Sequence, residues 1–272
     1  MEKIGKIAYR TNYDVPIVSK KRENTAKYIN PRVKYINGKW LLSFGVECES
    51  TKTELSMKFS GENFIADFSV GIDLGVKELA VISYNNGESK KTFKNINKTT
   101  KVRRLKKRMK QKQRNVSRKY QYGIKFRDNG DYAKTARILE EEAKVKKLHR
   151  KLANIRHNYT HHITSEIIEL NPSKIVLEDL NVTGMMKNKH LSEAIQEQTL
   201  HEFRRQIEYK AEWAGINVIY AGRFYPSSKK CSVCGHIKRD LKLKDRVYKC
   251  EVCGLSMDRD ENAAKNLEKL AI

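Results

Sequence analysis

Four cysteines in the last fifty residues have the spacing of a metal site. Cys231 and Cys234 form one C-x2-C pair, Cys250 and Cys253 form another, and fifteen residues separate the two pairs. Thiolates at this spacing suit a tetrahedral Zn²⁺ ion, because each short pair aims two sulfurs at one point. The alternatives are two disulfides or four unrelated thiols. They are disfavoured because nothing in the chain resembles a secreted protein and because such spacing rarely arises by chance. We therefore predict a structural zinc ribbon over residues 229–254.

Acidic residues occupy places where a carboxylate is costly or unexpected. Asp73 lies inside one apolar, strand-like run, and Glu178 ends another. Burying a carboxylate there is unfavourable by several kcal/mol unless a cation or a hydrogen-bond donor compensates it. Asp258 and Asp260 come just before a helical segment, whose positive N-terminal dipole stabilises a carboxylate. We expect these acids, which are distant in the sequence, to converge in the fold.

Converging carboxylates could bind divalent metal ions. Their oxygens suit Mg²⁺ or Mn²⁺, and two such ions activate a water and stabilise the leaving oxygen when a phosphodiester is cleaved. Asp73, Glu178 and Asp260 are the predicted catalytic and metal-binding acids. Asp258 is the alternative third acid, although Asp260 is nearer the helix that follows. Acids that meet on one sheet edge in this way are what an RNase H-like nuclease needs.

The charge of the chain points to nucleic acid as a partner. The 272 residues include 56 Lys or Arg and 32 Asp or Glu, which gives a formal net charge of +24. An excess of this size usually binds phosphates, with an affinity that falls steeply as salt rises. A ribosomal type of basic protein is the alternative, but it explains neither the cysteines nor the acids. No apolar run is long enough to cross a membrane and no signal peptide is evident, so we expect a cytoplasmic, nucleoid-associated protein with no membrane partner.

One segment concentrates the positive charge. Residues 101–119 contain eleven Lys or Arg and no acid, while apolar residues recur at roughly helical spacing. A merely solvated helix would normally mix both signs of charge, so this segment is predicted to contact nucleic acid. The predicted contacts are Lys101, Arg103, Arg104, Lys106, Lys107, Arg108, Lys110, Lys112, Arg114, Arg118 and Lys119.

The remaining pattern predicts an α/β fold. A hairpin is expected at residues 34–44 around Asn37-Gly38, a dipeptide typical of tight turns. Further strands are expected at 70–75, 79–84, 173–178 and 216–221, with helices at 101–119, 132–170 and 192–214 and after Asp260. Strands that alternate with helices in this order predict a sheet with helices packed on it.

Two histidines on the second predicted helix also have a spacing that could hold a metal. His157 and His161 are four residues apart, and His162 follows directly. No third ligand is evident in the sequence. We therefore expect these histidines to be solvated or to face phosphates.

The motifs together resemble those of the TnpB family, the transposon-encoded proteins often labelled OrfB transposases and related to type V CRISPR effectors. The resemblance is carried by residues 70–75, by 175–182, and by the four-cysteine ribbon with the run 258–266. It implies an RNase H-like (RuvC) nuclease with a helical arm. The implied activity is RNA-guided DNA cleavage, with a guide RNA derived from the transposon end and a matching target DNA.

The resemblance also implies a domain organisation. Residues 1–69 would form part of a wedge-type β-barrel, and residues 70–228 with 255–272 would form the RuvC-like domain. The helical arm would span 98–170 and the zinc ribbon 229–254. Family members usually begin with a longer recognition segment, which this chain is expected to lack.

Two further functional classes are compatible with these motifs. The chain could be a non-cutting remnant that binds RNA and DNA, or a transposase with strand-transfer chemistry. The position of the ribbon between the second and third acids favours the TnpB type over strand-transfer enzymes. The motifs indicate no oligomeric state.

Overall fold

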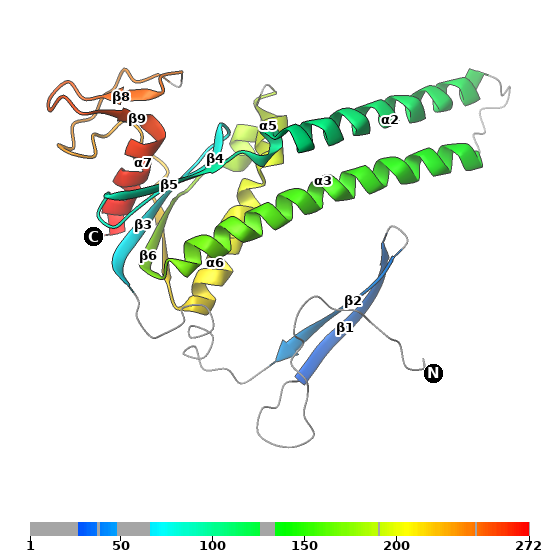
Figure 1. Cartoon of the computed structure of the whole chain (residues 1–272), viewed down its shortest axis with the longest axis horizontal. Helices are drawn as coiled ribbons and strands as arrows, with labels where there is room; N and C mark the ends of the chain where they lie inside the picture. The colour runs from blue at the N-terminus through cyan, green and yellow to red at the C-terminus, as the bar shows by residue number, and fades with distance from the viewer. Residues whose placement is uncertain are drawn as a thin grey trace. The chain divides into compact units, whose positions relative to one another are not determined.

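The computed structural model describes residues 27–36, 39–47, 66–125, 134–189, 191–242 and 244–271 (Figure 1). The chain divides into two compact units, Met1–Thr51 and Lys52–Ile272. Strand β3, which carries Asp73, begins at Ala66, a few residues before the expected domain start at residue 70. The wedge, nuclease and ribbon boundaries remain predictions.

The first unit contains the expected hairpin. Strands β1 (Lys27–Ile36) and β2 (Lys39–Glu47) pair in antiparallel fashion, and the pairing ends with Ile36 opposite Lys39. The predicted turn, Asn37-Gly38, lies outside the described residues. A register shift between Ile29 and Arg32 marks an irregularity in β1, where Asn30 has a positive φ of 51°. The hairpin prediction is therefore confirmed for its two strands.

The second unit is built on a five-stranded sheet with the order β5-β4-β3-β6-β7. Its strands are β3 (Ala66–Leu74), β4 (Glu78–Tyr84), β5 (Ser89–Lys94), β6 (Pro172–Glu178) and β7 (Asn217–Ala221). Strands β3, β4 and β5 pair in antiparallel fashion. Strand β6 pairs in parallel with the other edge of β3, and β7 pairs in parallel with β6. This arrangement confirms the expected α/β, RNase H-like fold.

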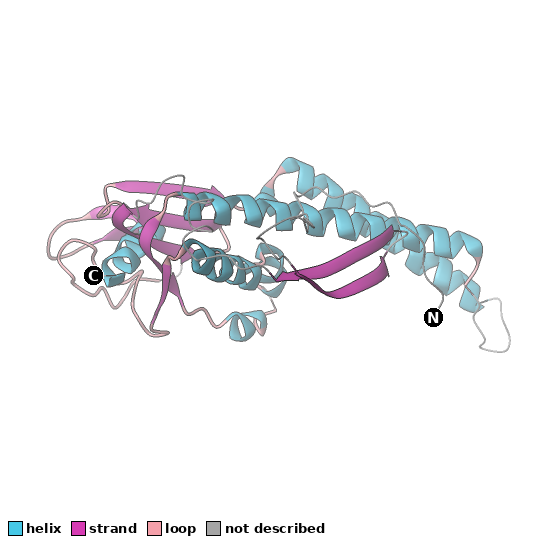
Figure 2. Ribbon diagram, turned by 90° about the horizontal axis from the view of Figure 1, so that it is seen from below, coloured by secondary structure: helices cyan, strands magenta, loops and turns pink. Residues whose placement is uncertain are grey.

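Long helices connect the two halves of the sheet. After β5 the chain forms the short η1 (Ile96–Lys98) and then helices α2 (Thr100–Lys125) and α3 (Ala136–Glu169), before it returns to the sheet at β6. The two long helices run side by side (Figure 2). Shorter helices follow, namely α4 (Val182–Met186), α5 (Ser192–Gln198), α6 (Leu200–Ala214), α7 (Arg259–Glu268) and η2 (Lys269–Ala271). In the part of the chain that the structure describes, no helix is both long and apolar enough to cross a membrane.

The single helix predicted for residues 192–214 is wrong in one respect. The chain breaks between α5 and α6 at Thr199, which has the left-handed φ of 54°. The buried amide of Gln198 donates to the carbonyl oxygens of Gly75 (3.1 Å) and Val76 (3.2 Å). These hydrogen bonds attach the end of α5 to the β3–β4 turn at the point where the chain changes direction.

Side-chain alternation along the strands sorts the core into two layers. In β3, Val70 and Ile72 are fully buried in the cluster that contains Ile163 of α3 and Phe203 of α6. On the other face, Val176 of β6 packs with residues such as Leu267 of α7. Because successive residues of a strand face opposite sides, Gly71 and Asp73 lie on the α7 face, as do Val176 and Glu178. The sheet therefore carries both acids on the face covered by α7.

Helix α7 touches the sheet most closely at Gly71. A Cβ atom at this position would lie 2.2 Å from the carbonyl oxygen of Ala264 and 2.2 Å from the amide nitrogen of Glu268. Both atoms belong to the helix backbone and cannot move aside as a flexible side chain would. Glycine at position 71 is thus required for the observed spacing between strand and helix.

We expect Gly71→Ala to destabilise the protein by about 1–3 kcal/mol, the usual range for overpacking a close contact. Gly222→Ala is the matched control, since a Cβ there meets no atom within 4 Å. The free energies of unfolding of both variants can be compared with that of the wild type by denaturant titration. Equal stability of the two variants would contradict the close approach.

Candidate metal and nuclease site

Asp73 and Glu178 lie at neighbouring strand ends. Strands β3 and β6 pair in parallel with Ile72 opposite Leu177, so the next residue of each strand is one of the two acids. Burial raises the pKa of Asp73 well above its usual range, and the charges of Glu178 and Asp260 raise it further. Burial also raises the pKa of Glu178; a hydrogen bond from Ser227 opposes this rise, and the charge of Asp260 adds to it. The structure thus brings three predicted acids within electrostatic reach of one another.

Asp258 and Asp260 have different surroundings on α7. Asp258 caps the helix, because its Oδ1 accepts hydrogen bonds from the backbone N–H groups of Asp260 (2.9 Å) and Glu261 (3.2 Å). Asp260 lies within the first turn of the helix and raises the pKa of both Asp73 and Glu178. The charge of Asp258 raises only the pKa of Asp73, and by less than the charge of Asp260 does. These surroundings favour Asp260 as the third acid and a capping role for Asp258.

Two arginines that were not anticipated from the sequence accompany the acids. Arg259 Nη2 lies 2.9 Å from Asp260 Oδ1, and Arg246 Nη1 lies 3.9 Å from Asp260 Oδ2. The guanidinium of Arg259 also lowers the pKa of Asp73, in opposition to the surrounding carboxylates. The acids are therefore partly neutralised by the protein itself. No local sequence pattern marks an arginine for this task in so basic a chain.

A chain of hydrogen bonds connects Glu178 to α7. Ser227, which follows β7, donates its hydroxyl to Glu178 Oε1. The buried amide of Asn266 donates in turn to the carbonyl oxygen of Ser227 (2.8 Å) and to that of Lys230 (2.6 Å). Asn262, also buried, donates to the same Lys230 oxygen (2.7 Å) and accepts from the N–H of Ser232 (3.0 Å). These contacts fix the entrance of the cysteine ribbon against the helix that carries Asp260.

The four cysteines form a compact cluster. One sulfur atom from each lies within 4.8 Å of all the others, and the closest pairs are Cys231 with Cys253 (3.6 Å) and Cys234 with Cys250 (3.5 Å). Sulfurs bound to one tetrahedral ion at about 2.3 Å are separated by about 3.8 Å, so this donor set fits a metal ion.

The fold around the cysteines is a small ribbon. Strands β8 (Val247–Lys249) and β9 (Ser256–Asp258) pair in antiparallel fashion, and β9 leads directly into α7. Gly235 (φ 76°) and Gly254 (φ 73°) each follow a cysteine pair in the left-handed region that glycine tolerates.

Helix α2 presents its basic residues along an open groove. The groove has a volume of about 830 Å³, and five of its lining residues were predicted nucleic-acid contacts, namely Arg103, Lys106, Lys107, Lys110 and Arg114. A smaller hollow is lined by three more, Lys112, Arg118 and Lys119. The other three, Lys101, Arg104 and Arg108, are exposed on the same helix.

Three of these lysines already have acidic partners. Lys106 pairs with Glu197 (2.5 Å), Lys110 with Glu193 (3.6 Å), and Lys112 with Glu141 of α3 (3.0 Å). These ion pairs hold α2 against neighbouring helices. The remaining groove residues are therefore better placed to meet a phosphate backbone.

The two histidines have an acidic neighbour that was not evident in the sequence, and the expectation that they are solvated or face phosphates stays a prediction. Glu202, at the start of α6, lies against His157 and His161, and the three together form a group that could hold a metal ion. No spacing in the sequence indicates this contact, because β6, α4 and α5 separate α3 from α6 along the chain.

Comparison with known proteins covers most of the second unit. Residues 66–189 match the family model OrfB_IS605, described as "Probable transposase", and residues 201–267 match the Cas12f1-like TNB domain. The chain is 31% identical over 230 residues to a Streptomyces pristinaespiralis protein, across 85% of this chain and 49% of that protein. It is 30% identical over 283 residues to InsQ of Escherichia coli K12, across 98% of this chain and 60% of InsQ. Both relatives carry the name of a candidate RNA-guided DNA endonuclease.

Solved structures show the same fold. A Cas12f1 protein determined in complex with guide RNA and target DNA matches with a TM-score of 0.54 at 19% identity, over 88% of this chain and 56% of that one. The chain thus spans about half the length of the relatives it matches. The residues that match the two family models form the strands, helices and ribbon described above. We conclude that this protein belongs to the TnpB family.

Proposed function

We propose that this chain is a transposon-associated, RNA-guided DNA endonuclease that hydrolyses phosphodiester bonds with divalent metal ions. The observation that supports this most strongly is the set of carboxylates on the α7 face of the sheet. The charges of Glu178 and Asp260 raise the pKa of Asp73, and the charge of Asp260 also raises that of Glu178, as expected for acids that are crowded together. Such an arrangement is relieved when a cation binds between them.

The residues around the acids have separate tasks in this proposal. Asp73, Glu178 and Asp260 would hold Mg²⁺ or Mn²⁺, which would supply charge stabilisation and an activated water when bound. Ser227 keeps the carboxylate of Glu178 oriented through its hydroxyl. Arg259 keeps Asp260 oriented through two bonds to Oδ1, of 3.1 Å from Nε and 2.9 Å from Nη2.

The proposed partners are a guide RNA from the transposon end and a matched target DNA. Support comes from the α2 groove, which is lined by predicted basic contacts. The segment that supplies them, residues 101–119, contains no acid. The Cas12f1 structure that shares the fold is itself a complex with guide RNA and target DNA. These partners would place the protein in the cytoplasm with the nucleoid.

The four-cysteine cluster is proposed to hold a structural Zn²⁺. Its role would be to brace the acids, since the ribbon leads through β9 into α7 and is held there by Asn262 and Asn266. Because binding of metal supplies much of the folding free energy of such small ribbons, α7 would depend on the metal for its position.

Replacing Asp73 tests the nuclease site. We expect Asp73→Asn to lower the rate of DNA cleavage by at least about 100-fold, since a lost metal ligand removes several kcal/mol of charge stabilisation at 1.4 kcal/mol per decade. Asp240→Asn is the control, because its side chain is 75% exposed and its nearest cation lies 4.0 Å away. Both variants would be purified with their co-purifying RNA and assayed on matched DNA with Mg²⁺.

The same assay separates the other two functional classes. Tight RNA and DNA binding by the wild type without any nicking, in Mg²⁺ and in Mn²⁺, would identify a non-cutting binder. Joined transposon ends in the products would identify a strand-transfer transposase. Equal cleavage by wild type and Asp73→Asn would show that Asp73 is not a catalytic residue.

The two aspartates of α7 can be distinguished by conservative substitution. Asparagine caps a helix about as well as aspartate, so Asp258→Asn should leave both stability and cleavage close to wild type. Asp260→Asn should abolish cleavage, because an amide replaces a metal-binding carboxylate. Comparable losses of cleavage in both variants, measured with unchanged thermal unfolding, would contradict the assignment of Asp258 as a cap.

Removing the ribbon metal should reduce cleavage indirectly. We expect Cys231→Ala with Cys234→Ala to lose bound zinc, to expose residues 229–256 to proteases and to lower cleavage. Zinc content would be measured by atomic absorption and local opening by limited proteolysis. Cys48→Ala, which changes the fifth cysteine of the chain, is the control. A zinc-free double variant that cuts at the wild-type rate would refute the bracing role.

A further inference from the structure

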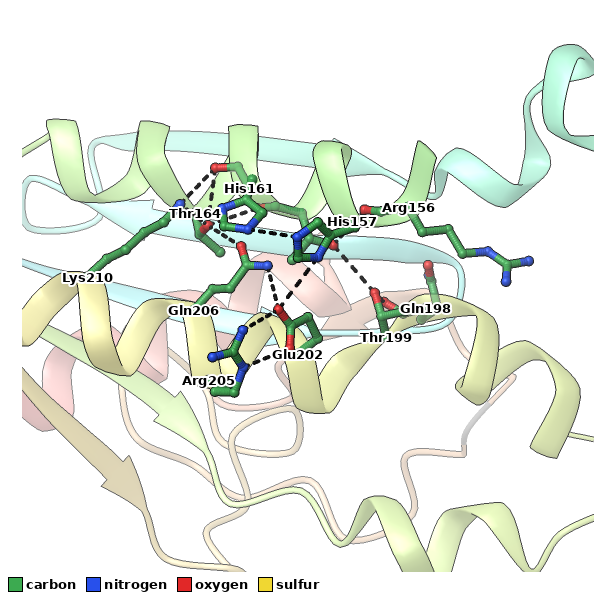
Figure 3. Close-up of polar contacts among 11 residues, drawn as sticks. Arg156, His157, His161, Thr164, Gln198, Thr199, Glu202, Arg205, Gln206 and Lys210 are labelled. Carbon is green, nitrogen blue, oxygen red and sulfur yellow. Dashed lines mark hydrogen bonds and ion pairs between the residues drawn. The ribbon is translucent and has the colours of Figure 1, made fainter. Parts of the chain in front are cut away.

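Three side chains of metal-binding type converge between α3 and α6, on the opposite face of the sheet from the acids (Figure 3). His157 and His161 are one turn apart on α3, and their Nε2 atoms are separated by 3.1 Å. Glu202 faces them from the first turn of α6, with Oε1 at 3.7 Å from His157 Nδ1. One donor atom from each of the three residues lies within 4.8 Å of the others.

The separation of the two histidine nitrogens suits a first-row transition metal. Nitrogen and oxygen donors bound to one ion at about 2.0–2.1 Å are separated by about 2.9–3.4 Å, depending on whether the geometry is octahedral or tetrahedral. The 3.1 Å between the two Nε2 atoms, which share a hydrogen bond in the absence of an ion, falls inside this range. Glu202 Oε1 lies 3.7 Å from the other ring nitrogen of His157, so the carboxylate must move closer for all three residues to bind one ion. Two imidazoles and one carboxylate are a donor set for Zn²⁺, Ni²⁺ or Co²⁺ rather than for Mg²⁺ or Ca²⁺.

Residues around the cluster hold the donors in place. Glu202 accepts hydrogen bonds from Arg205 Nε and Nη2 and from Gln206 Nε2, each at 2.8 Å. The Arg205 bonds chiefly lower the pKa of Glu202 to about 2, so its carboxylate is ionised at neutral pH. Burial lowers the pKa of His161, which favours the neutral imidazole that a metal needs. Partners of this kind tune a metal ligand and fix its orientation.

A buried polar network sets the position of α3 against α6 beneath the cluster. Lys210 is only 4% exposed, and its ammonium donates to the carbonyl oxygen of His161 (2.9 Å) and to the hydroxyls of Thr164 (2.7 Å) and Ser165 (2.9 Å). The Thr164 hydroxyl also contacts Gln206 Oε1 at 3.0 Å. The two helix faces that carry the donors are thus held in register without any ion.

The cluster is open on one side. The side chain of His157 is 51% exposed and that of Glu202 is 28% exposed, so an ion could reach the donors from solvent and keep water in its remaining positions. An ion would have to share Glu202 Oε1 with Arg205 and Gln206, which both donate to that oxygen. Binding therefore requires a small rearrangement of these donors around Glu202.

We propose that His157, His161 and Glu202 form a third metal site, for a divalent ion of the Zn²⁺, Ni²⁺ and Co²⁺ class. Its ligands come from α3, the second helix of the arm, and from α6, which packs on the sheet. An ion bound there ties the base of the arm to the core. This site is independent of the carboxylates on the α7 face and of the cysteine ribbon.

Cobalt titration of the untagged full chain separates this site from the ribbon. The Asp73→Asn variant, in which the carboxylate site is disabled, is first given one equivalent of Zn²⁺, which the four thiolates take up, and Co²⁺ is then added while absorption and heat are recorded. We expect one further equivalent to bind, with d–d bands but without the sulfur-to-metal charge transfer of a thiolate site. The proposal would be overturned if no further Co²⁺ bound. It would also be overturned if all of the bound Co²⁺ showed the charge-transfer band of a thiolate site.

Matched histidine variants locate the ion. We expect His157→Gln and His161→Gln each to weaken the additional Co²⁺ binding by at least about 10–100-fold, the range found for loss of even an outer partner of a metal ligand. His162→Gln, which changes an exposed histidine outside the cluster, should bind as the wild type does. Thermal unfolding without Co²⁺ checks that each variant is folded, and Co²⁺ should raise Tm only where the site is intact. Wild-type affinity in the His161→Gln variant would also overturn the proposal.

Discussion

The contact of α7 with β3 at Gly71 is the constraint on which the arrangement of the acids depends. The helix backbone lies where any side chain at position 71 would be, with Ala264 O only 2.2 Å from the position of a Cβ. Asp73 is two residues further along the same strand face, and Asp260 lies one helical turn before Ala264. A larger residue at the contact would move the helix, and with it one carboxylate relative to the other. The small size of Gly71 thus determines the relative positions of Asp73 and Asp260, although Gly71 contacts neither carboxylate.

Two buried asparagines extend this constraint to the ribbon. Asn262 and Asn266 are fully buried on α7, and both donate to the carbonyl oxygen of Lys230, just before the first cysteine. Asn266 also holds the carbonyl of Ser227, whose hydroxyl reaches Glu178. Each of these amides satisfies backbone groups that would otherwise be buried without partners. Replacing either asparagine is therefore expected to lower the stability of the fold. These hydrogen bonds consequently fix the ribbon, helix α7 and Glu178 relative to one another.

Local patterns predicted most elements but few of the contacts between them. The apolar runs around Asp73 and Glu178 marked β3 and β6 because strand burial leaves a pattern in neighbouring residues. The break at Thr199 was missed, since it depends on Gln198 reaching carbonyls more than a hundred positions away. Glu202 was missed as a partner of His157 for the same reason: helix packing brings them together, and no spacing records it. Ser227 and Arg259 likewise reveal their roles only through neighbours that are distant in sequence.

The distance along the chain between contacting residues also has a consequence for folding. Ser83 of β4 donates to Glu268 of α7 across 185 positions, and Ser173 donates to the carbonyl of Phe68 across 105. Contacts of such long range close large loops and form slowly compared with a helical hairpin such as α2 with α3. The arm can therefore form while the sheet is still incomplete, whereas the three carboxylates meet only after the ribbon and α7 have docked. A partly folded chain would present its basic helix before it presents the clustered acids.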